Sequence, residues 1–137
     1  MGALADAALA GGGKVTGVIP RALVSREIAH CGLTELIEIG SMHERKAEMA
    51  QRADGFLVLP GGLGTLDELC EILTWAALGF HDKPVVLINI AGYWDAFLKM
   101  LDGAVASGFL RPTHRGLPLV APGVVWACDA VAQLWSR

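Results

Sequence analysis

The sequence lacks any apolar run long enough to cross a membrane, and it lacks the excess of basic residues that nucleic-acid binding favours. Its longest apolar stretches, such as residues 85–90, fall far short of the roughly 20 residues that a membrane helix needs. With 11 basic and 14 acidic residues the formal net charge is −3, whereas phosphate backbones are bound by strongly basic faces. We therefore expect no membrane span and no nucleic-acid partner, and any phosphate site must be local.

Cysteine is also scarce. Cys31, Cys70 and Cys128 are odd in number and widely separated, which fits neither a disulfide framework nor a metal site with C-x-x-C spacing. Cys70 and Cys128 fall in helical patterns beside apolar neighbours, so we expect buried thiols that act as small hydrophobic side chains. No basic segment of a secretory signal follows Met1, and the predicted location is therefore the cytoplasm.

Length and composition predict a single domain over residues 1–137. Hydrophobic residues make up 53% of the chain and charged residues 18%, a composition too apolar for disorder. A chain of this size buries roughly two thirds of its unfolded surface in one core, which leaves no room for a second domain.

Short β-branched runs alternate with helical patterns along the chain, a spacing typical of βαβ units. We predict an α/β fold, a Rossmann-like doubly wound parallel sheet with helices on both faces. The runs at 56–59 and 85–90 lack polar alternation, so both are expected as central strands covered on two sides. The predicted strands are 15–19, 35–39, 56–59, 85–90 and 117–121, and the predicted helices are 2–10, 42–53, 66–78, 94–106 and 125–135.

The start of the chain departs from this scheme. A parallel α/β sheet normally begins with a strand, yet residues 2–10 form an amphipathic, alanine-rich helical pattern that ends at three glycines, 11–13. We expect that a first βα segment is missing, either lost from this chain or encoded upstream in a longer natural protein.

A glycine-rich loop at residues 60–65, Pro-Gly-Gly-Leu-Gly-Thr, follows a predicted strand and opens a predicted helix. Glycines in this arrangement let backbone N–H groups approach an anion at the helix N-terminus, so the loop predicts a phosphate cradle formed by Gly61, Gly62, Gly64 and Thr65. The alternative is a tight turn without a ligand. The spacing matches neither the Walker pattern nor the dinucleotide fingerprint, and no cofactor is expected.

Two acidic side chains follow this loop. Thr65 and Glu68 match a capping box, in which Glu68 would only satisfy the backbone N–H of Thr65. A carboxylate at the mouth of a phosphate cradle also stands where a glycosidic centre would be, and the two roles can coexist. Glu71 falls on the same helical face as Glu68 at i,i+3, so the two carboxyl groups could titrate as a coupled pair.

A second capping box, Ser41 to Glu44, starts a helix that carries Arg45 and Lys46. Charges on a helix usually mark only a solvated face. These two cations, however, lie near the helix start, at the carboxyl edge of the predicted sheet, where open α/β sheets bind ligands. Arginine can bind a monophosphate in bidentate fashion.

The four histidines, by contrast, predict no metal site. They lack the i,i+4 spacing of a helical zinc site, and no Ser-His-Asp order is legible. The simplest interpretation of His81 and the residues after it is a loop that leads into the strand at 85. The histidines are His30, His43, His81 and His114.

Together, residues 41–49, Ser-Met-His-Glu-Arg-Lys-Ala-Glu-Met, and 59–68, Leu-Pro-Gly-Gly-Leu-Gly-Thr-Leu-Asp-Glu, resemble the paired M-H-x-R-K and P-G-G-x-G-T-x-x-E motifs of the LONELY GUY family. The interval between the motifs also fits, and the resemblance covers most of the chain up to about Arg111. It implies hydrolysis of the N-glycosidic bond of an N6-substituted adenosine 5'-monophosphate, or of AMP, to the free cytokinin base and ribose 5-phosphate.

The resemblance also implies residue roles and an assembly. Arg45 and Glu68 match the family's catalytic pair: Glu68 would orient or deprotonate the attacking water, and Arg45 would fix Glu68 and a substrate oxygen. Family members form at least dimers, so a homodimer is expected. The positions that correspond to nucleotide-binding residues are Glu27, Met42, Lys46, Gly61, Gly62, Gly64, Thr65 and Thr74, and we add Glu71 from helical geometry.

Two other functions remain open at this stage. One is a nucleotide-binding module that keeps the phosphate cradle but performs no chemistry, which a missing first segment would favour. The other is a carrier of the molybdenum cofactor, against which the intact Met-His-x-Arg-Lys motif argues. Family members are often labelled lysine decarboxylases, but nothing in the sequence resembles a pyridoxal phosphate site.

Overall fold

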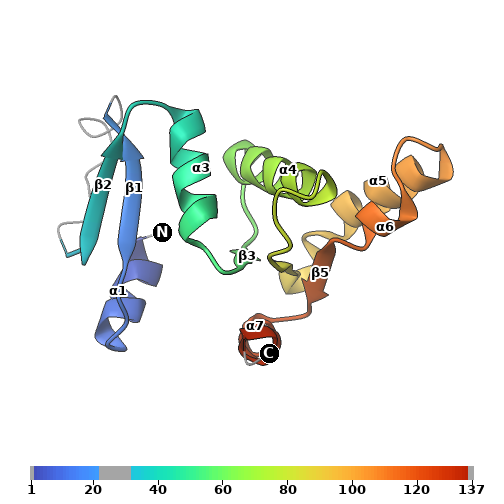
Figure 1. Cartoon of the computed structure of the whole chain (residues 1–137). Coiled ribbons are helices and arrows are strands. Elements are labelled where there is room, and N and C mark those ends of the chain that lie inside the picture. Colours follow the sequence, from blue (N-terminus) through green and yellow to red (C-terminus); the bar gives the residue numbers. More distant parts are fainter. Residues whose placement is uncertain (1, 22–31, 136–137) are drawn as a thin grey trace. The chain divides into compact units, whose positions relative to one another are not determined.

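The computed structural model describes residues 2–21 and 32–135, in two compact units, Met1–Arg52 and Ala53–Arg137. Every strand pairing in the described residues is parallel, which confirms the predicted α/β class (Figure 1). The strands pair in two sheets, however, one of two strands in the first unit and one of three in the second.

The first unit contains α1 (Gly2–Ala10), β1 (Thr16–Pro20), β2 (Glu35–Ile39) and α3 (Met42–Arg52). Strands β1 and β2 pair in register from Thr16 opposite Glu35 to Pro20 opposite Ile39. Helix α1 has the predicted bounds and ends at the predicted glycines, where Gly12 takes the left-handed conformation with φ of 80°. No residue of α1 is fully buried, although Ala5 and Leu9 are half-buried.

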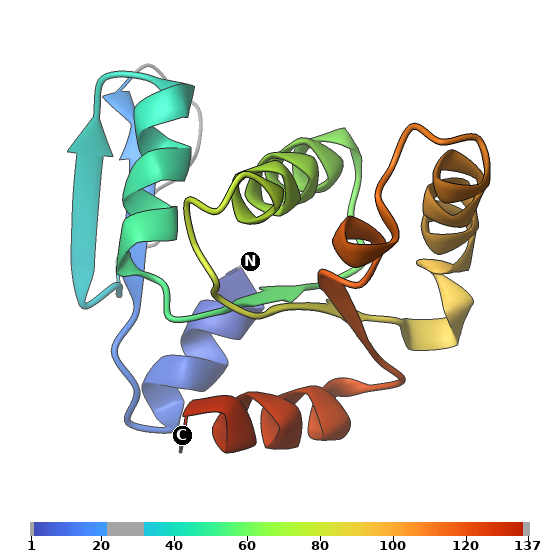
Figure 2. The same cartoon turned by 45° about the vertical axis from the view of Figure 1, so that its right-hand side comes forward.

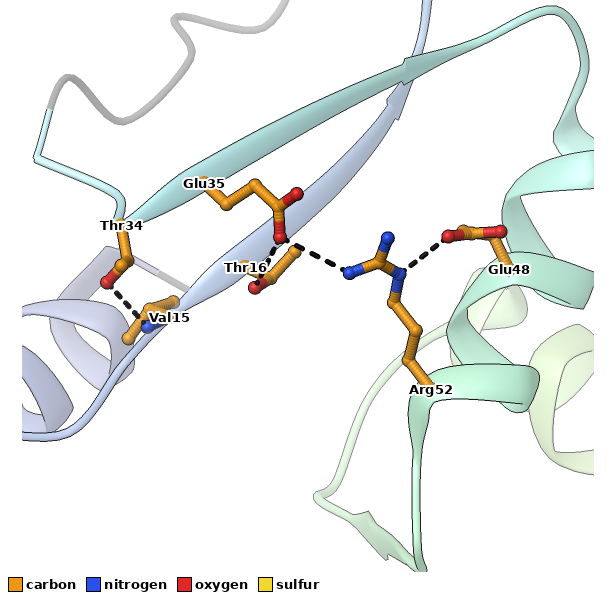
Figure 3. Close-up of polar contacts among 6 residues, drawn as sticks. All are labelled: Val15, Thr16, Thr34, Glu35, Glu48 and Arg52. Atoms are coloured by element: carbon orange, nitrogen blue, oxygen red, sulfur yellow. Dashed lines mark hydrogen bonds and ion pairs between the residues drawn. The ribbon is translucent and has the colours of Figure 1, made fainter.

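Polar side chains connect the strands and helix of the first unit (Figure 3). Arg52, in the last turn of α3, pairs with Glu48 at 2.5 Å and with Glu35 of β2 at 3.2 Å. Thr16 donates to the same Glu35 oxygen at 3.3 Å. The hydrogen bond to Glu48 and the two nearby carboxylates raise the pKa of Arg52 above its ordinary value, so the guanidinium keeps its charge at every physiological pH.

The second unit contains a parallel sheet in the order β3-β4-β5. Figure 2 shows two helices on opposite sides of this sheet, α4 on one side and α7 on the other, as predicted for a doubly wound arrangement. The elements of this unit are β3 (Phe56–Val58), α4 (Leu63–Ala77), β4 (Val85–Ile88), the 3-10 turn η1 (Ile90–Gly92), α5 (Asp95–Ala106), α6 (Pro112–Arg115), β5 (Pro118–Ala121) and α7 (Val124–Trp135).

Strand β4 forms the centre of the second unit. All four of its residues, Val85–Ile88, are buried, as the unbroken apolar run predicted. On one face Val86 and Ile88 cluster with Ala121 of β5 and with side chains of α7, Ala127 and Val131. Burial on both faces explains why no polar residue interrupts this strand.

Strand β3 was predicted, like β4, as a central strand. Within the second unit it stands at the end of the three-stranded order, next to β4, and the side chain of Leu57 is 46% exposed. Hydrophobicity reports the faces of a strand but not its hydrogen-bonding neighbours, so the same apolar pattern occurs in both strands of this unit.

The cysteines correct one prediction. Cys70 on α4 and Cys128 on α7 are free thiols, and both are exposed. Cys31 lies outside the described residues. No helix within residues 2–21 and 32–135 has the length and apolar character to span a membrane.

Candidate functional site

The glycine loop joins β3 to α4 within the second unit. Helix α4 begins at Leu63, with Gly62 as its N-cap, three residues before the predicted start. Its first helical hydrogen bond runs from the Leu66 N–H to the Gly62 carbonyl at 3.1 Å. The backbone N–H groups of Leu63, Gly64 and Thr65 precede that bond, so they have no partner in the preceding turn and point along the helix axis. Such a set of donors favours an anion.

The glycines of this loop differ in what surrounds them. A Cβ at Gly61 would collide with the hydroxyl and Cβ of Thr65, so a side chain here requires Thr65 to move. At Gly62 and Gly64 no atom lies within 4 Å of the position that a Cβ would take. Packing therefore explains the glycine at 61, whereas the open space at 62 and 64 leaves the backbone accessible to a ligand.

The earlier helix start also corrects the predicted capping box at Thr65. Because Gly62 is the cap, and no side chain caps the helix, Thr65 lies in the first turn. Glu68 and Glu71 follow on α4 and are both half-buried. Farther along, the Thr74 hydroxyl donates to the carbonyl of Cys70 at 2.7 Å, so its oxygen remains available as a hydrogen-bond acceptor.

A second loop of the same unit reaches the glycine loop. The hydroxyl of Tyr93, which follows β4 and η1, donates to the carbonyl of Gly61 at 2.5 Å. The two motifs, at residues 41–49 and 59–68, do not include Tyr93. The signal that could have identified it is its place just after the carboxyl end of β4, because loops after neighbouring parallel strands meet at one edge of a sheet.

The second predicted capping box is present at the start of α3. Ser41 Oγ accepts the N–H of Glu44 at 3.2 Å, and the Glu44 carboxylate accepts the N–H of Gly40 at 2.8 Å. In the standard motif the glutamate returns to the N-cap itself, whereas here it bonds one residue earlier. The two bonds fix the first turn of α3, which carries Met42 and Arg45.

The side chain of Arg45 contacts the backbone of strand β1. Its Nε donates to the carbonyl of Val18 in β1 at 3.0 Å, in a partly buried position. Lys46 is half-buried and Met42 is 45% exposed. This contact with the backbone at the middle of β1 restricts the orientations of the guanidinium.

The predicted site residues thus fall into two groups, one in each unit. The first unit holds Met42, Arg45 and Lys46 on α3. Glu27 lies outside the described residues. Within the described ranges no group of three or more His, Cys, Asp or Glu side chains is arranged to hold a metal ion. The second unit holds Gly61, Gly62, Gly64, Thr65, Glu68, Glu71 and Thr74.

A family model described as "Possible lysine decarboxylase" matches residues 1–131, and so covers both groups of residues. The chain belongs to this family. Its relatives include a protein of Oryza sativa subsp. japonica named probable cytokinin riboside 5'-monophosphate phosphoribohydrolase, 53% identical over 89% of this chain and 54% of its own length. A cytokinin riboside 5'-monophosphate phosphoribohydrolase of Arabidopsis thaliana is 49% identical over 89% of this chain and 57% of its own length.

These matches confirm the resemblance to the LONELY GUY proteins that the two motifs indicated. The family description mentions a decarboxylase, whereas these relatives are named as hydrolases of a nucleotide. The chain spans a little over half the length of these relatives.

Proposed function

We propose that this protein hydrolyses the N-glycosidic bond of N6-substituted adenosine 5'-monophosphates and of AMP, without a cofactor. Water adds its hydroxyl to C1' of the ribose as the bond from C1' to the base breaks, and its proton passes to the base. The products are the free base and ribose 5-phosphate. The observation that carries the proposal is the open glycine loop at the start of α4, in a chain about 50% identical to relatives named for this reaction.

The phosphate supplies the anchor in this proposal. The amides at residues 62–65 bind the 5'-phosphate, and Thr65 adds its hydroxyl. Lys46, Met42, Thr74 and Glu27 contribute further nucleotide contacts. Holding a remote phosphate uses its binding energy to align the ribose C1' with the catalytic groups. The support is the set of N–H donors ahead of the first helical bond of α4 and the open space at Gly62 and Gly64.

Glu68 and Arg45 are the proposed catalytic pair. As a carboxylate, Glu68 stabilises the cationic ribosyl transition state and accepts a proton from the attacking water, by analogy with glycoside hydrolysis. Arg45 binds a substrate oxygen, and its contact with Val18 limits the orientations that its guanidinium can adopt. Glu71, one turn after Glu68 on α4, completes the proposed set by its charge on the same face.

The test is release of free base from isopentenyladenosine monophosphate. Glu68→Gln should reduce base release by a factor of about 100 to 10,000, the usual contribution of a general base, and should leave nucleotide affinity nearly unchanged. Asp67→Asn is the matched control, because it removes a neighbouring carboxylate on the exposed side of the same turn, and it should keep full turnover. Unchanged turnover in Glu68→Gln would refute the assignment.

The same assay separates this reaction from the two other functions. A wild-type protein that binds AMP but releases no base would be a nucleotide-binding module. Copurification of a molybdenum cofactor would identify a carrier instead.

We also propose that the protein acts as a homodimer in the cytoplasm and that its two units belong to one Rossmann-like domain. Leu63 is 85% exposed, Leu78 64% and Phe80 74%, and apolar side chains of this size favour burial against a partner. The free thiols Cys70 and Cys128 fit a reducing compartment. One family model matches across both units. Sedimentation of a monomer at micromolar concentration would exclude the dimer.

A further inference from the structure

The segment after β4 is fixed by a single asparagine side chain. The Asn89 side-chain carbonyl accepts the N–H of Trp94 at 2.7 Å, and its amide donates to the carboxylate of Asp95, also at 2.7 Å. The Asn89 backbone N–H donates to the carbonyl of Ala121 in β5 at 2.7 Å. These three bonds attach the segment to the sheet and to the start of α5.

Between these anchors the backbone turns through two residues of left-handed conformation, Ala91 with φ of 52° and Gly92 with φ of 72°. A non-glycine residue keeps such a conformation only where its surroundings impose it. Beyond the turn, the ring of Trp94 is fully buried, and it meets the ring of Tyr93 edge-on at 5.1 Å between centroids. The turn in the backbone and the ring contact with Trp94 therefore both restrict the position of the Tyr93 phenol.

That phenol reaches the glycine loop from 32 residues away in sequence, donating to the carbonyl of Gly61 at 2.5 Å. The carbonyl of Gly61 and the N–H of Gly62 belong to one planar trans peptide, so they point in opposite directions. A bond that holds the carbonyl toward Tyr93 therefore turns the N–H of Gly62 away from the β4 loop. Withdrawing electrons through the carbonyl also makes that N–H a better donor.

A peptide between two glycines needs such a restraint. Glycine populates both signs of φ with little steric cost, so the peptide joining Gly61 and Gly62 can rotate as a unit. Neither neighbour can restrict it with a side chain, and no side chain caps the helix that follows. The Tyr93 hydroxyl supplies a side-chain restraint on this carbonyl.

We propose that Tyr93 is a positioning residue: its hydroxyl locks the Gly61–Gly62 peptide with the Gly62 N–H turned toward the 5'-phosphate. The inference rests on the proposed function for the identity of the ligand. It assigns Tyr93 no contact with the substrate and no step of the reaction.

Tyr93→Phe tests the proposal, because it removes the hydroxyl and keeps the ring that packs on Trp94. We expect the dissociation constant for AMP to rise about three- to tenfold, the usual effect of one hydrogen bond, while affinity for adenosine, which lacks the phosphate, stays the same. KM should rise with kcat within about twofold. Amide hydrogen exchange at residues 62 and 63 of the ligand-free protein should become faster.

Thr34→Val is the matched control. It deletes one side-chain hydroxyl that accepts a backbone N–H, that of Val15 at 3.0 Å, in the first unit. A general loss of stability would affect both variants, whereas loss of the peptide lock should change the ratio of AMP to adenosine affinity only in Tyr93→Phe.

The outcomes for Tyr93 and for the reaction are distinguishable. If Tyr93→Phe keeps the wild-type affinity ratio, or weakens AMP and adenosine equally, the lock is wrong even where the wild-type protein releases base. If the wild-type protein binds AMP and releases no base, the proposed reaction fails, and the affinity ratio still decides the role of Tyr93. A wild-type protein that binds no AMP would overturn both proposals.

Discussion

The two units of this protein differ in the contacts that stabilise each of them internally. Among the described residues of the first unit only Ile19 and Pro20 are buried, whereas the second unit buries β4, Trp94 and parts of α4, β5 and α7. In the first unit the contacts between elements include exposed hydrogen bonds and ion pairs around Glu35, Glu48 and Arg52, besides the partly buried bond from Arg45 to Val18. Exposed pairs contribute little, because water solvates the separated charges well.

Because of this difference in burial, the two units position their candidate functional groups in different ways. The second unit offers backbone amides from a loop that is anchored on a buried sheet, and their positions depend on a core. The first unit offers the side chain of Arg45 from a helix whose start is fixed by a local capping box. We therefore expect core mutations to damage the glycine loop and cap mutations to damage the arginine helix.

The largest expected effect is at the centre of the second unit. Leu87→Ala removes a fully buried side chain of β4 and should lower the free energy of unfolding by about 2–5 kcal/mol. Urea unfolding followed by circular dichroism measures it, because both units contain helices and strands that contribute to this signal.

The matched control for Leu87 is the same deletion in the first unit. Leu36 of β2 is 41% exposed, so Leu36→Ala should cost less than about 1 kcal/mol. Equal losses for the two leucines would show that the units do not differ in the way described.

This contrast also shows what the sequence could and could not predict. The apolar run at Val85–Ile88 predicted a covered strand correctly, since burial on both faces leaves a pattern in the chain. The run at Phe56–Val58 looked the same, yet within the second unit this strand pairs with β4 alone, because strand neighbours are set by topology. The phosphate loop was predictable from its glycines. The bond from Tyr93 was not, because it joins residues 32 positions apart.

Helix starts show the same limit. Ser41 and Glu44 were predicted as a capping box and form one. Thr65 and Glu68 carry the same signature, but α4 starts three residues earlier at Gly62. Gly62 and Thr65 are both possible N-caps within one loop, and a local motif does not decide between them. The roles of Arg45 and Glu68 come from the family motifs, and turnover of their variants must test them.

The next largest effect is at the cap of α3. Ser41→Ala removes the acceptor of the Glu44 N–H and should destabilise the first turn of this helix by about 1 kcal/mol. Amide hydrogen exchange at residues 44–46 should accelerate, while tryptophan fluorescence of the second unit stays unchanged. Ser107→Ala, at the exposed C-cap of α5, is the control and should change neither signal.

A smaller effect of opposite sign is expected at the turn after β4. Ala91 has a left-handed backbone with φ of 52°, which costs a residue with a Cβ about 1–2 kcal/mol. Ala91→Gly removes that strain but adds freedom to the unfolded chain, so a net gain of roughly 0.5 kcal/mol is expected. Ala104→Gly in the regular helix α5 should instead destabilise the unit. A loss of stability in Ala91→Gly would show that the turn is unstrained.

The smallest expected effect is in the ion pairs of the first unit. The raised pKa of Arg52 follows mainly from its hydrogen bond to Glu48. A raised pKa means that the charged arginine stabilises the folded state. This stabilisation is present at neutral pH and is lost only as the pH rises through the pKa of the folded state, in strong alkali. Salt is therefore the useful variable. Arg52→Met should make amide hydrogen exchange in α3 slightly faster at low salt. This difference from the wild-type protein should vanish at about 1 M salt, where charges are screened within a few ångströms.

Arg115→Met supplies the comparison in the second unit. Arg115 pairs with Asp102 at 2.6 Å, with side-chain exposures of 27% and 61%, so this pair is about as exposed as the pairs of Arg52 with Glu48 and Glu35, at 48% with 30% and 51%. Arg115→Met should therefore destabilise its unit about as little as Arg52→Met does, and that loss should likewise vanish at high salt. If the Arg52 substitution proved the more damaging and stayed so in salt, exposed polar contacts would hold the first unit more strongly than its lack of a core implies.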